Sequence, residues 1–62
     1  MRLTVKVLPE GRKPILLHYE ASERTEAMAE WDRQLENARP GTICELINED
    51  TGRITSSYHP KG

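Results

Sequence analysis

The chain has 62 residues, 31% of them charged, and a formal net charge of −1. A chain of this length forms one domain of marginal stability, because it buries only about 60% of the surface that its unfolded form exposes. Cys44 is the only cysteine, which excludes an internal disulfide, and no apolar run approaches the roughly 20 residues that span a bilayer.

These features also predict the cellular location and the oligomeric state of the protein. The sequence shows neither the apolar stretch of a signal peptide nor a membrane segment, so we expect a cytoplasmic protein. The nearly balanced charge predicts no general attraction to nucleic acids or anionic membranes. Small chains without disulfides or metals often gain stability by oligomerising, and a homodimer is the expected state.

The first third of the chain predicts a β-hairpin. Residues 2–7 alternate polar and apolar side chains, which is typical of a half-buried strand. Residues 9–14 contain two prolines and a glycine and predict the loop. Residues 15–20 predict the second strand, with Ile15, Leu17 and Tyr19 expected on one face.

A change to helical periodicity follows. Ser22 is the predicted N-cap, because a serine hydroxyl can accept a hydrogen bond from the first helical turn. The predicted end lies at residues 39–41, where proline and glycine disfavour a continuing helix. The apolar stripe expected to cover the core consists of Ala27, Met28, Trp31, Leu35 and Ala38.

A second hairpin is predicted from residues 42–48 and 53–58, which flank a turn at residues 49–52. If Glu49 faces Arg53, then Cys44 and Leu46 share a face with Ile54 and Tyr58, and Ile43 and Ile47 lie on the other. A slip of one residue would exchange the two faces of the third strand, so both phases stay open at this point.

Together these elements predict an α+β domain of ββαββ order over residues 1–58, with a flexible tail at residues 59–62. Its two hairpins would form an antiparallel four-stranded sheet, covered on one face by the single helix.

Candidate chemistry is sparse. Cys44, His18 and His59 are the only set that could suggest a nucleophile or a metal site, and they lack both the spacing and the number of ligands that zinc requires. The glycines are isolated at turns and form no phosphate-binding loop. We therefore predict a protein that is not an enzyme and has no catalytic residue, metal or cofactor.

The surplus of aliphatic residues points instead to association. One helix covers one sheet face, and apolar side chains left on the other face usually mark an interface. The candidate interface residues are Leu16, His18, Ile43, Ile47 and Tyr58.

Charge gives two weaker surface hypotheses. An acidic docking face for a basic partner would consist of Glu23, Glu26 and Glu30 on the helix. A basic patch for nucleic acid would consist of Lys6, Arg12, Lys13 and Arg53.

Residues 51–60 read Thr-Gly-Arg-Ile-Thr-Ser-Ser-Tyr-His-Pro. This stretch resembles a family of uncharacterised small bacterial ββαββ proteins, whose last strand reads Gly-Arg-Ile and then Ser-Tyr-Gly. His59 stands where that family has glycine. The resemblance implies the fold and no active site.

The predicted function is a small protein–protein interaction module, a regulator or inhibitor of the kind that phages and mobile elements encode. It would act as a homodimer through the open sheet face or an edge strand, with another protein as a further possible partner. The alternative is a nucleic-acid-associated regulator, which the net charge disfavours.

Overall fold

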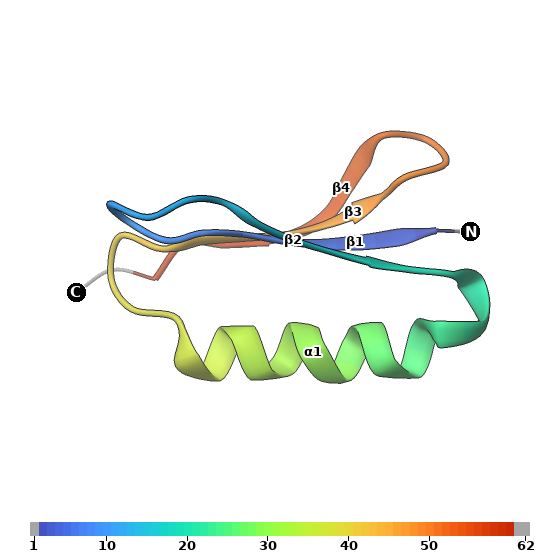
Figure 1. Ribbon diagram of the computed structural model, residues 1–62, viewed down its shortest axis with the longest axis horizontal. Helices are drawn as coiled ribbons and strands as arrows, with labels where there is room; N and C mark the ends of the chain where they lie inside the picture. Colours follow the sequence, from blue (N-terminus) through green and yellow to red (C-terminus); the bar gives the residue numbers. More distant parts are fainter. Residues whose placement is uncertain (1, 61–62) are drawn as a thin grey trace.

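The computed structural model describes residues 2–60 and contains a four-stranded sheet with one long helix beneath it (Figure 1). The elements in chain order are β1 (Leu3–Leu8), β2 (Ile15–Tyr19), the short 3-10 helix η1 (Ala21–Glu23), α1 (Arg24–Asn37), β3 (Ile43–Asn48) and β4 (Arg53–Tyr58). All neighbouring strands are antiparallel, and their order across the sheet is β2-β1-β3-β4. The predicted ββαββ fold is confirmed.

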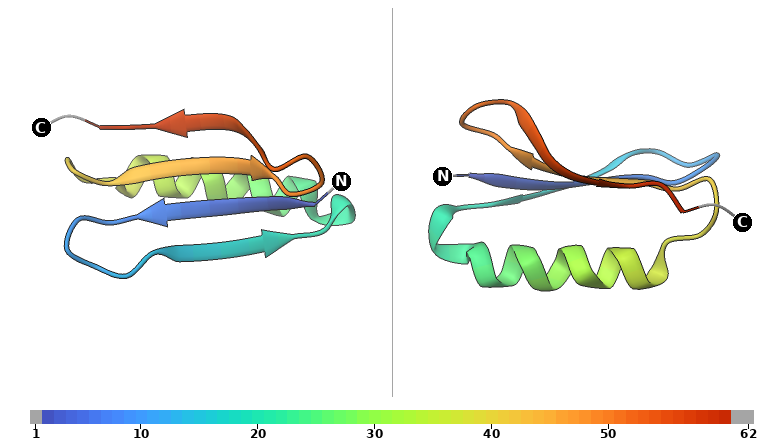
Figure 2. Two further views of the ribbon diagram at one scale, coloured as in Figure 1. Left: turned by 90° about the horizontal axis from the view of Figure 1, so that it is seen from above. Right: turned by 180° about the vertical axis from the view of Figure 1, so that it is seen from behind.

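The core lies between the sheet and α1. Strands β1 and β3 form the centre of the sheet, and α1 packs beneath β1, β2 and β3 (Figure 2). The buried cluster consists of Val5, Val7, Trp31, Cys44 and Leu46. Leu17, Tyr19, Leu35 and Ala38 are partly buried against it. The alternating pattern of β1 and the placement of Trp31 in the core are therefore confirmed.

The start of the helix differs from the prediction. Ser22 lies inside η1 and is not the N-cap. Instead, the Glu20 amide donates a hydrogen bond of 3.0 Å to Oε1 of Glu23, and the Glu23 amide donates one of 2.9 Å to the Glu20 carbonyl. These two bonds pair the amides of Glu20 and Glu23 at the start of the helical segment, which therefore begins at Ala21, one residue before Ser22.

Two residues of the predicted apolar faces lie outside the core. Met28 on α1 is 37% exposed, because the buried side of the helix is narrower than the stripe and centres on Ala27 and Trp31. Ile15 is 45% exposed at the beginning of β2, on the sheet face toward α1, where it pairs with Val7.

The β3–β4 hairpin contains a β-bulge that the sequence did not reveal. Cys44 pairs with Tyr58 and Leu46 with Ser56, but Ile47 pairs with Ile54, so Thr55 is the extra residue. The Thr55 hydroxyl donates a hydrogen bond of 3.0 Å to the Leu46 carbonyl. Because the register shifts by one residue, Ile54 lies on the same face as Ile47, and its predicted place beside Cys44 is wrong.

The turn of this hairpin shows the same shift. Asn48 faces Arg53, and the expected pair of Glu49 with Arg53 does not form. Glu49 instead extends toward β1, where its amide donates a hydrogen bond of 2.8 Å to the Arg2 carbonyl. Residues 59 and 60 follow β4 without regular structure, and the rest of the predicted tail, residues 61 and 62, lies outside the described residues.

Candidate interaction surface

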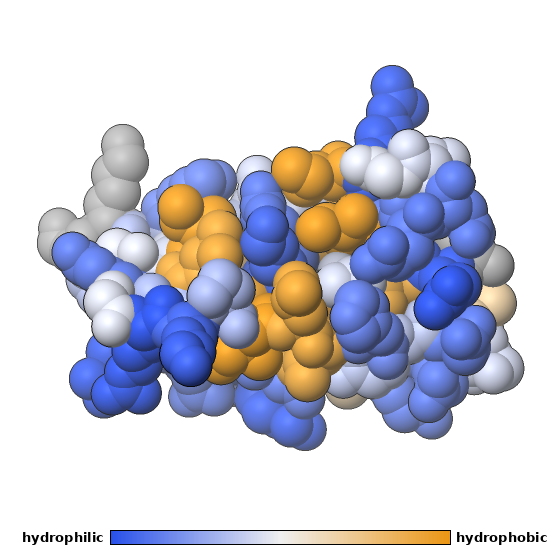
Figure 3. All heavy atoms as spheres, turned by 45° about the horizontal axis from the view of Figure 1, so that its top comes forward, coloured by the Kyte–Doolittle hydropathy of each residue, from blue (hydrophilic) through white to orange (hydrophobic). Residues whose placement is uncertain are grey.

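The sheet face opposite α1, called here the open face, carries a group of aliphatic side chains. Alternation along each strand and the register between strands place them together. Figure 3 shows hydrophobic atoms gathered on this side of the molecule. We call the group the aliphatic patch; it consists of Leu8, Leu16, Ile43, Ile47 and Ile54.

The aliphatic patch is substantially open to solvent. Leu16 is 50% exposed and Ile54 is 51% exposed, while the other three side chains are half-buried. The structure decides between the two open phases of β3, because Cys44 and Leu46 are buried against α1 and Ile43 and Ile47 alternate with them on the open face. The bulge at Thr55 adds Ile54, a patch residue that the sequence analysis missed.

A pair of opposite charges lies in the middle of the open face. Lys6 on β1 and Glu45 on β3 are direct cross-strand partners, and both are half-buried. Leu16 on β2 pairs with Lys6, and Ser57 on β4 pairs with Glu45, so the four residues form one row across the sheet. We call Lys6 and Glu45 the central pair. Leu8 and Ile43 flank it on one side, and Ile47 and Ile54 flank it on the other.

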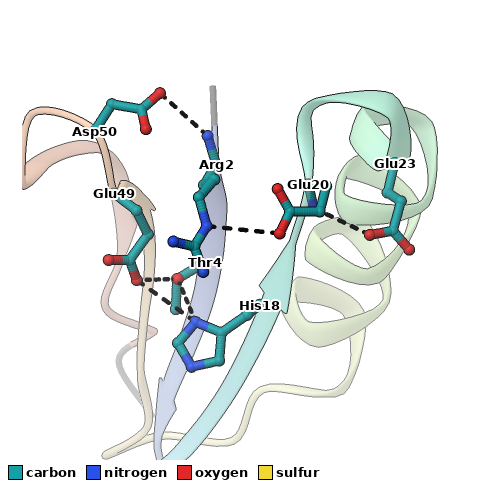
Figure 4. A network of polar contacts seen from close by, with 7 residues as sticks. All are labelled: Arg2, Thr4, His18, Glu20, Glu23, Glu49 and Asp50. Carbon is teal, nitrogen blue, oxygen red and sulfur yellow. Dashed lines mark hydrogen bonds and ion pairs between the residues drawn. The ribbon is translucent and has the colours of Figure 1, made fainter.

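A polar network closes one end of the open face (Figure 4). The Thr4 hydroxyl donates a hydrogen bond to Oε1 of Glu49, and Nδ1 of His18 lies 2.9 Å from the same hydroxyl oxygen. In the tautomer that carries a proton on Nδ1, His18 therefore donates to Thr4. Arg2 extends the network, because its amide donates to Asp50 at 3.2 Å and its Nε lies 3.6 Å from Oε1 of Glu20.

The Thr4 hydroxyl in this network does not have the geometry of an activated nucleophile. Thr4 is only 1% exposed, so no substrate can reach its hydroxyl as a nucleophile. His18 and Glu49 contact the same oxygen of Thr4, whereas a catalytic base is oriented by a third group on its far side. The network joins β1, β2 and the β3–β4 turn, and it places the predicted interface residue His18 at the end of the open face.

Tyr58 lies elsewhere. Its partner across β3–β4 is Cys44, so its side chain is on the sheet face toward α1, where it remains 40% exposed. Of the predicted interface residues, the structure brings together Leu16, His18, Ile43 and Ile47 on the open face and leaves Tyr58 on the other face.

The predicted acidic residues are partly engaged within the chain. Glu30 has a side chain only 15% exposed, and it accepts hydrogen bonds from Arg33 at 2.8 Å and from Gln34 at 2.7 Å. Glu23 accepts the bond from the Glu20 amide. Glu26 is exposed in the first turn of α1, so these three carboxylates do not form one equally free docking face.

The predicted basic residues are distributed along the sheet. Arg53 begins β4 opposite Asn48, next to the turn at residues 49–52, and Lys6 lies in the middle of the open face. Arg12 and Lys13 lie at the other end, where the β1–β2 loop, Arg39 and the C-terminal end of α1 line an open cavity of about 640 Å³. This cavity is also lined by the carboxylate residue Glu10.

Cys44 is fully buried, and burial raises the pKa of its thiol, which disfavours the reactive thiolate. Within residues 2–60, no group of three or more histidine, cysteine, aspartate or glutamate side chains could hold a metal ion. Over the same residues, no helix is long and apolar enough to cross a membrane.

Comparisons with known proteins found no matching family model, no matching curated protein and no matching solved structure. The resemblance of residues 51–60 to a small bacterial ββαββ family therefore stays a prediction.

Proposed function

We propose that this chain is a non-enzymatic protein–protein interaction module that acts as a homodimer through its open face. The observation that carries the proposal is the aliphatic patch, because α1 covers one face of the sheet and leaves five aliphatic side chains on the other. Contiguous apolar surface of this kind marks interaction sites in soluble proteins. A small regulator or inhibitor is the functional class that fits such a module.

The geometry of the sheet edges favours the open face, and not an edge strand, as the docking surface. The outer strands are β2 and β4, and only an edge with a regular ladder of free backbone groups readily accepts another strand. The bulge at Thr55 interrupts that ladder on β4, which disfavours pairing along this edge. The other outer strand, β2, is only five residues long, and very short edge strands pair less readily.

The test is the solution mass as a function of concentration, measured by light scattering. We expect the wild type to approach twice 7.1 kDa and the triple variant Leu16→Thr, Ile47→Thr, Ile54→Thr to stay a monomer. Threonine keeps the β-branched shape that strands favour while removing apolar surface. The matched control is Ile15→Thr, which removes an equally exposed aliphatic side chain from the other face and should remain dimeric. A monomeric wild type, or a dimeric triple variant, would refute the proposal.

A second candidate, a nucleic-acid-associated regulator, is favoured by one observation. Arg12, Lys13 and Arg39 meet around the cavity at the β1–β2 loop, although Arg53 lies at the other end of the sheet. Such a protein would bind single-stranded RNA or DNA with an affinity that falls steeply as salt is added. Equal weak retention by wild type and Arg12→Ala, Lys13→Ala at low salt would eliminate it.

A further inference from the structure

We propose that the two copies in the dimer are related by a two-fold axis parallel to their strands, so that Lys6 of each copy pairs with Glu45 of the other. This inference rests on the proposed function and adds to it the identity and orientation of the partner. A two-fold interface is self-complementary, which means that if residue i of one copy contacts residue j of the other, then j also contacts i. One rotation of the open face satisfies this condition.

Strand order determines what each rotation brings together. The sheet order β2-β1-β3-β4 has its midline between β1 and β3. A half-turn about an axis above this midline exchanges β1 with β3 and β2 with β4. Lys6 then lies over Glu45 of the second copy, Glu45 lies over its Lys6, and the neighbouring Leu8 lies over Ile43.

The other simple arrangement is disfavoured by charge. An axis running across the strands through the row of the central pair would keep each strand over its own counterpart. Lys6 would then face Lys6 and Glu45 would face Glu45. Like charges brought together in a partly desolvated interface are strongly unfavourable, so the central pair selects the axis parallel to the strands.

Sheet twist is compatible with this choice. Two twisted sheets that pack face to face keep their strand directions within about 30° of one another, at a separation of about 10 Å. A rotation of that size displaces residues near the centre of the sheet least, and the central pair lies there. Long lysine and glutamate side chains can meet across such a gap, where their attraction fixes the register.

The available surface is of the right size. The molecule measures 34 by 20 by 18 Å, and the open face extends along the longest and shortest of these directions (Figures 1 and 2). Its projected area is therefore at most roughly 600 Å² on each copy, and two such faces correspond to the low end of the roughly 1,200–2,000 Å² of total surface that specific interfaces bury. A second copy of this chain covers the whole aliphatic patch at once.

Charge reversal tests the pairing directly. Lys6→Glu places two glutamates opposite each other in both halves of the interface, and Glu45→Lys does the same with lysines. We expect each variant alone to dimerise at least about tenfold more weakly than the wild type.

An equimolar mixture of the two variants should regain the dimer as a heterodimer. In that heterodimer the two reversed side chains, one from each copy, face each other with opposite charges, and the second pair keeps its native charges. Because the two substitutions change the mass of a copy by only about 1 Da, one variant is uniformly labelled with ¹⁵N, and native mass spectrometry then separates the heterodimer from both homodimers.

A second variant keeps the test decisive if a single reversal disturbs the fold. The double variant Lys6→Glu, Glu45→Lys restores opposite charges both within and between copies and should dimerise like the wild type. The matched control pair is Lys13→Glu and Glu36→Lys, both exposed outside the open face, whose homodimers should be unaffected. If the single variants dimerise as the wild type does, or their mixture gives no heterodimer excess, the proposed orientation is wrong. In that case a monomeric aliphatic triple variant would still support the open face as the interface.

Discussion

Tyr19 lies at the end of β2, on the sheet face that α1 covers, and near a carboxylate. Burial raises the pKa of its phenol, and the charge of Glu30 raises it further. Both effects favour the neutral phenol in the folded state, and an ionised Tyr19 would lie partly desolvated beside Glu30. The residue therefore links the stability of the β2–α1 contact to alkaline pH.

The sign of this linkage gives a testable prediction. The unfolded chain loses the phenol proton near pH 10, whereas the folded chain holds it to higher pH. The contribution to stability is complete below about pH 10 and is lost as the pH rises through the folded pKa. Urea unfolding between about pH 8 and pH 11 should show a smaller alkaline loss of stability for Tyr19→Phe than for the wild type. Tyr58→Phe is the control, and an identical loss in wild type and Tyr19→Phe would contradict the prediction.

Residue environments also show where sequence reasoning reached its limit. Burial of Cys44 was predictable, because a free cysteine among apolar residues of a strand usually behaves as a small buried hydrophobe. Burial of Thr4 was not, since a threonine in the polar phase of an amphipathic strand is expected to face water. Its hydroxyl is buried because His18 and Glu49, residues 14 and 45 positions away, both contact it. No local pattern contains that information.

Among the elements, the connection between α1 and β3 is a tight turn defined by Pro40 and Gly41. The Thr42 amide donates a hydrogen bond of 3.0 Å to the Arg39 carbonyl, and Gly41 has a φ of 90°. Proline followed by a glycine with positive φ is the signature of a type II turn. The Glu10 side chain packs directly against Gly41, so a Cβ at this position would overlap it.

Replacing this glycine should therefore destabilise the protein. We expect Gly41→Ala to lower the free energy of unfolding by about 1–2 kcal/mol through the left-handed backbone alone. The measurement is urea unfolding of Gly41→Ala with and without Glu10→Ala. Because the Glu10 carboxylate is the mobile end of a side chain, removing it should recover only a small part of the loss. Full recovery in the double variant would mean that the overlap, and not the backbone, is the dominant cost.

The sequence patterns predicted the fold, because each type of element has a pattern of its own. Alternation identified β1, helical spacing identified α1, and Pro and Gly marked the turns. The register near the β3–β4 turn was wrong by one residue, because Thr55 is an ordinary strand residue by composition and carries no sign of a bulge. That one residue decides which face Ile54 occupies, and so it also decides the extent of the aliphatic patch.

At the scale of the whole molecule, a dimer makes stability depend on concentration. Binding between folded copies stabilises them by mass action, so a tenfold rise in concentration should raise the Tm by roughly 3–6 °C for a domain of this size. Thermal unfolding followed by circular dichroism from about 10 μM to about 1 mM would measure the change. The aliphatic triple variant should show a Tm that does not change with concentration, and a constant Tm in the wild type would argue against a dimer.

The bulge at Thr55 bears on how far such an assembly can grow. Two copies that meet by their open faces leave the outer strand of each sheet free, and a regular outer strand could recruit further copies into an open-ended fibril. The irregular ladder of β4 interrupts that growth on one side of every sheet. The bulge that adds Ile54 to the aliphatic patch thereby favours, in the proposed dimer, an assembly that stops at a finite size.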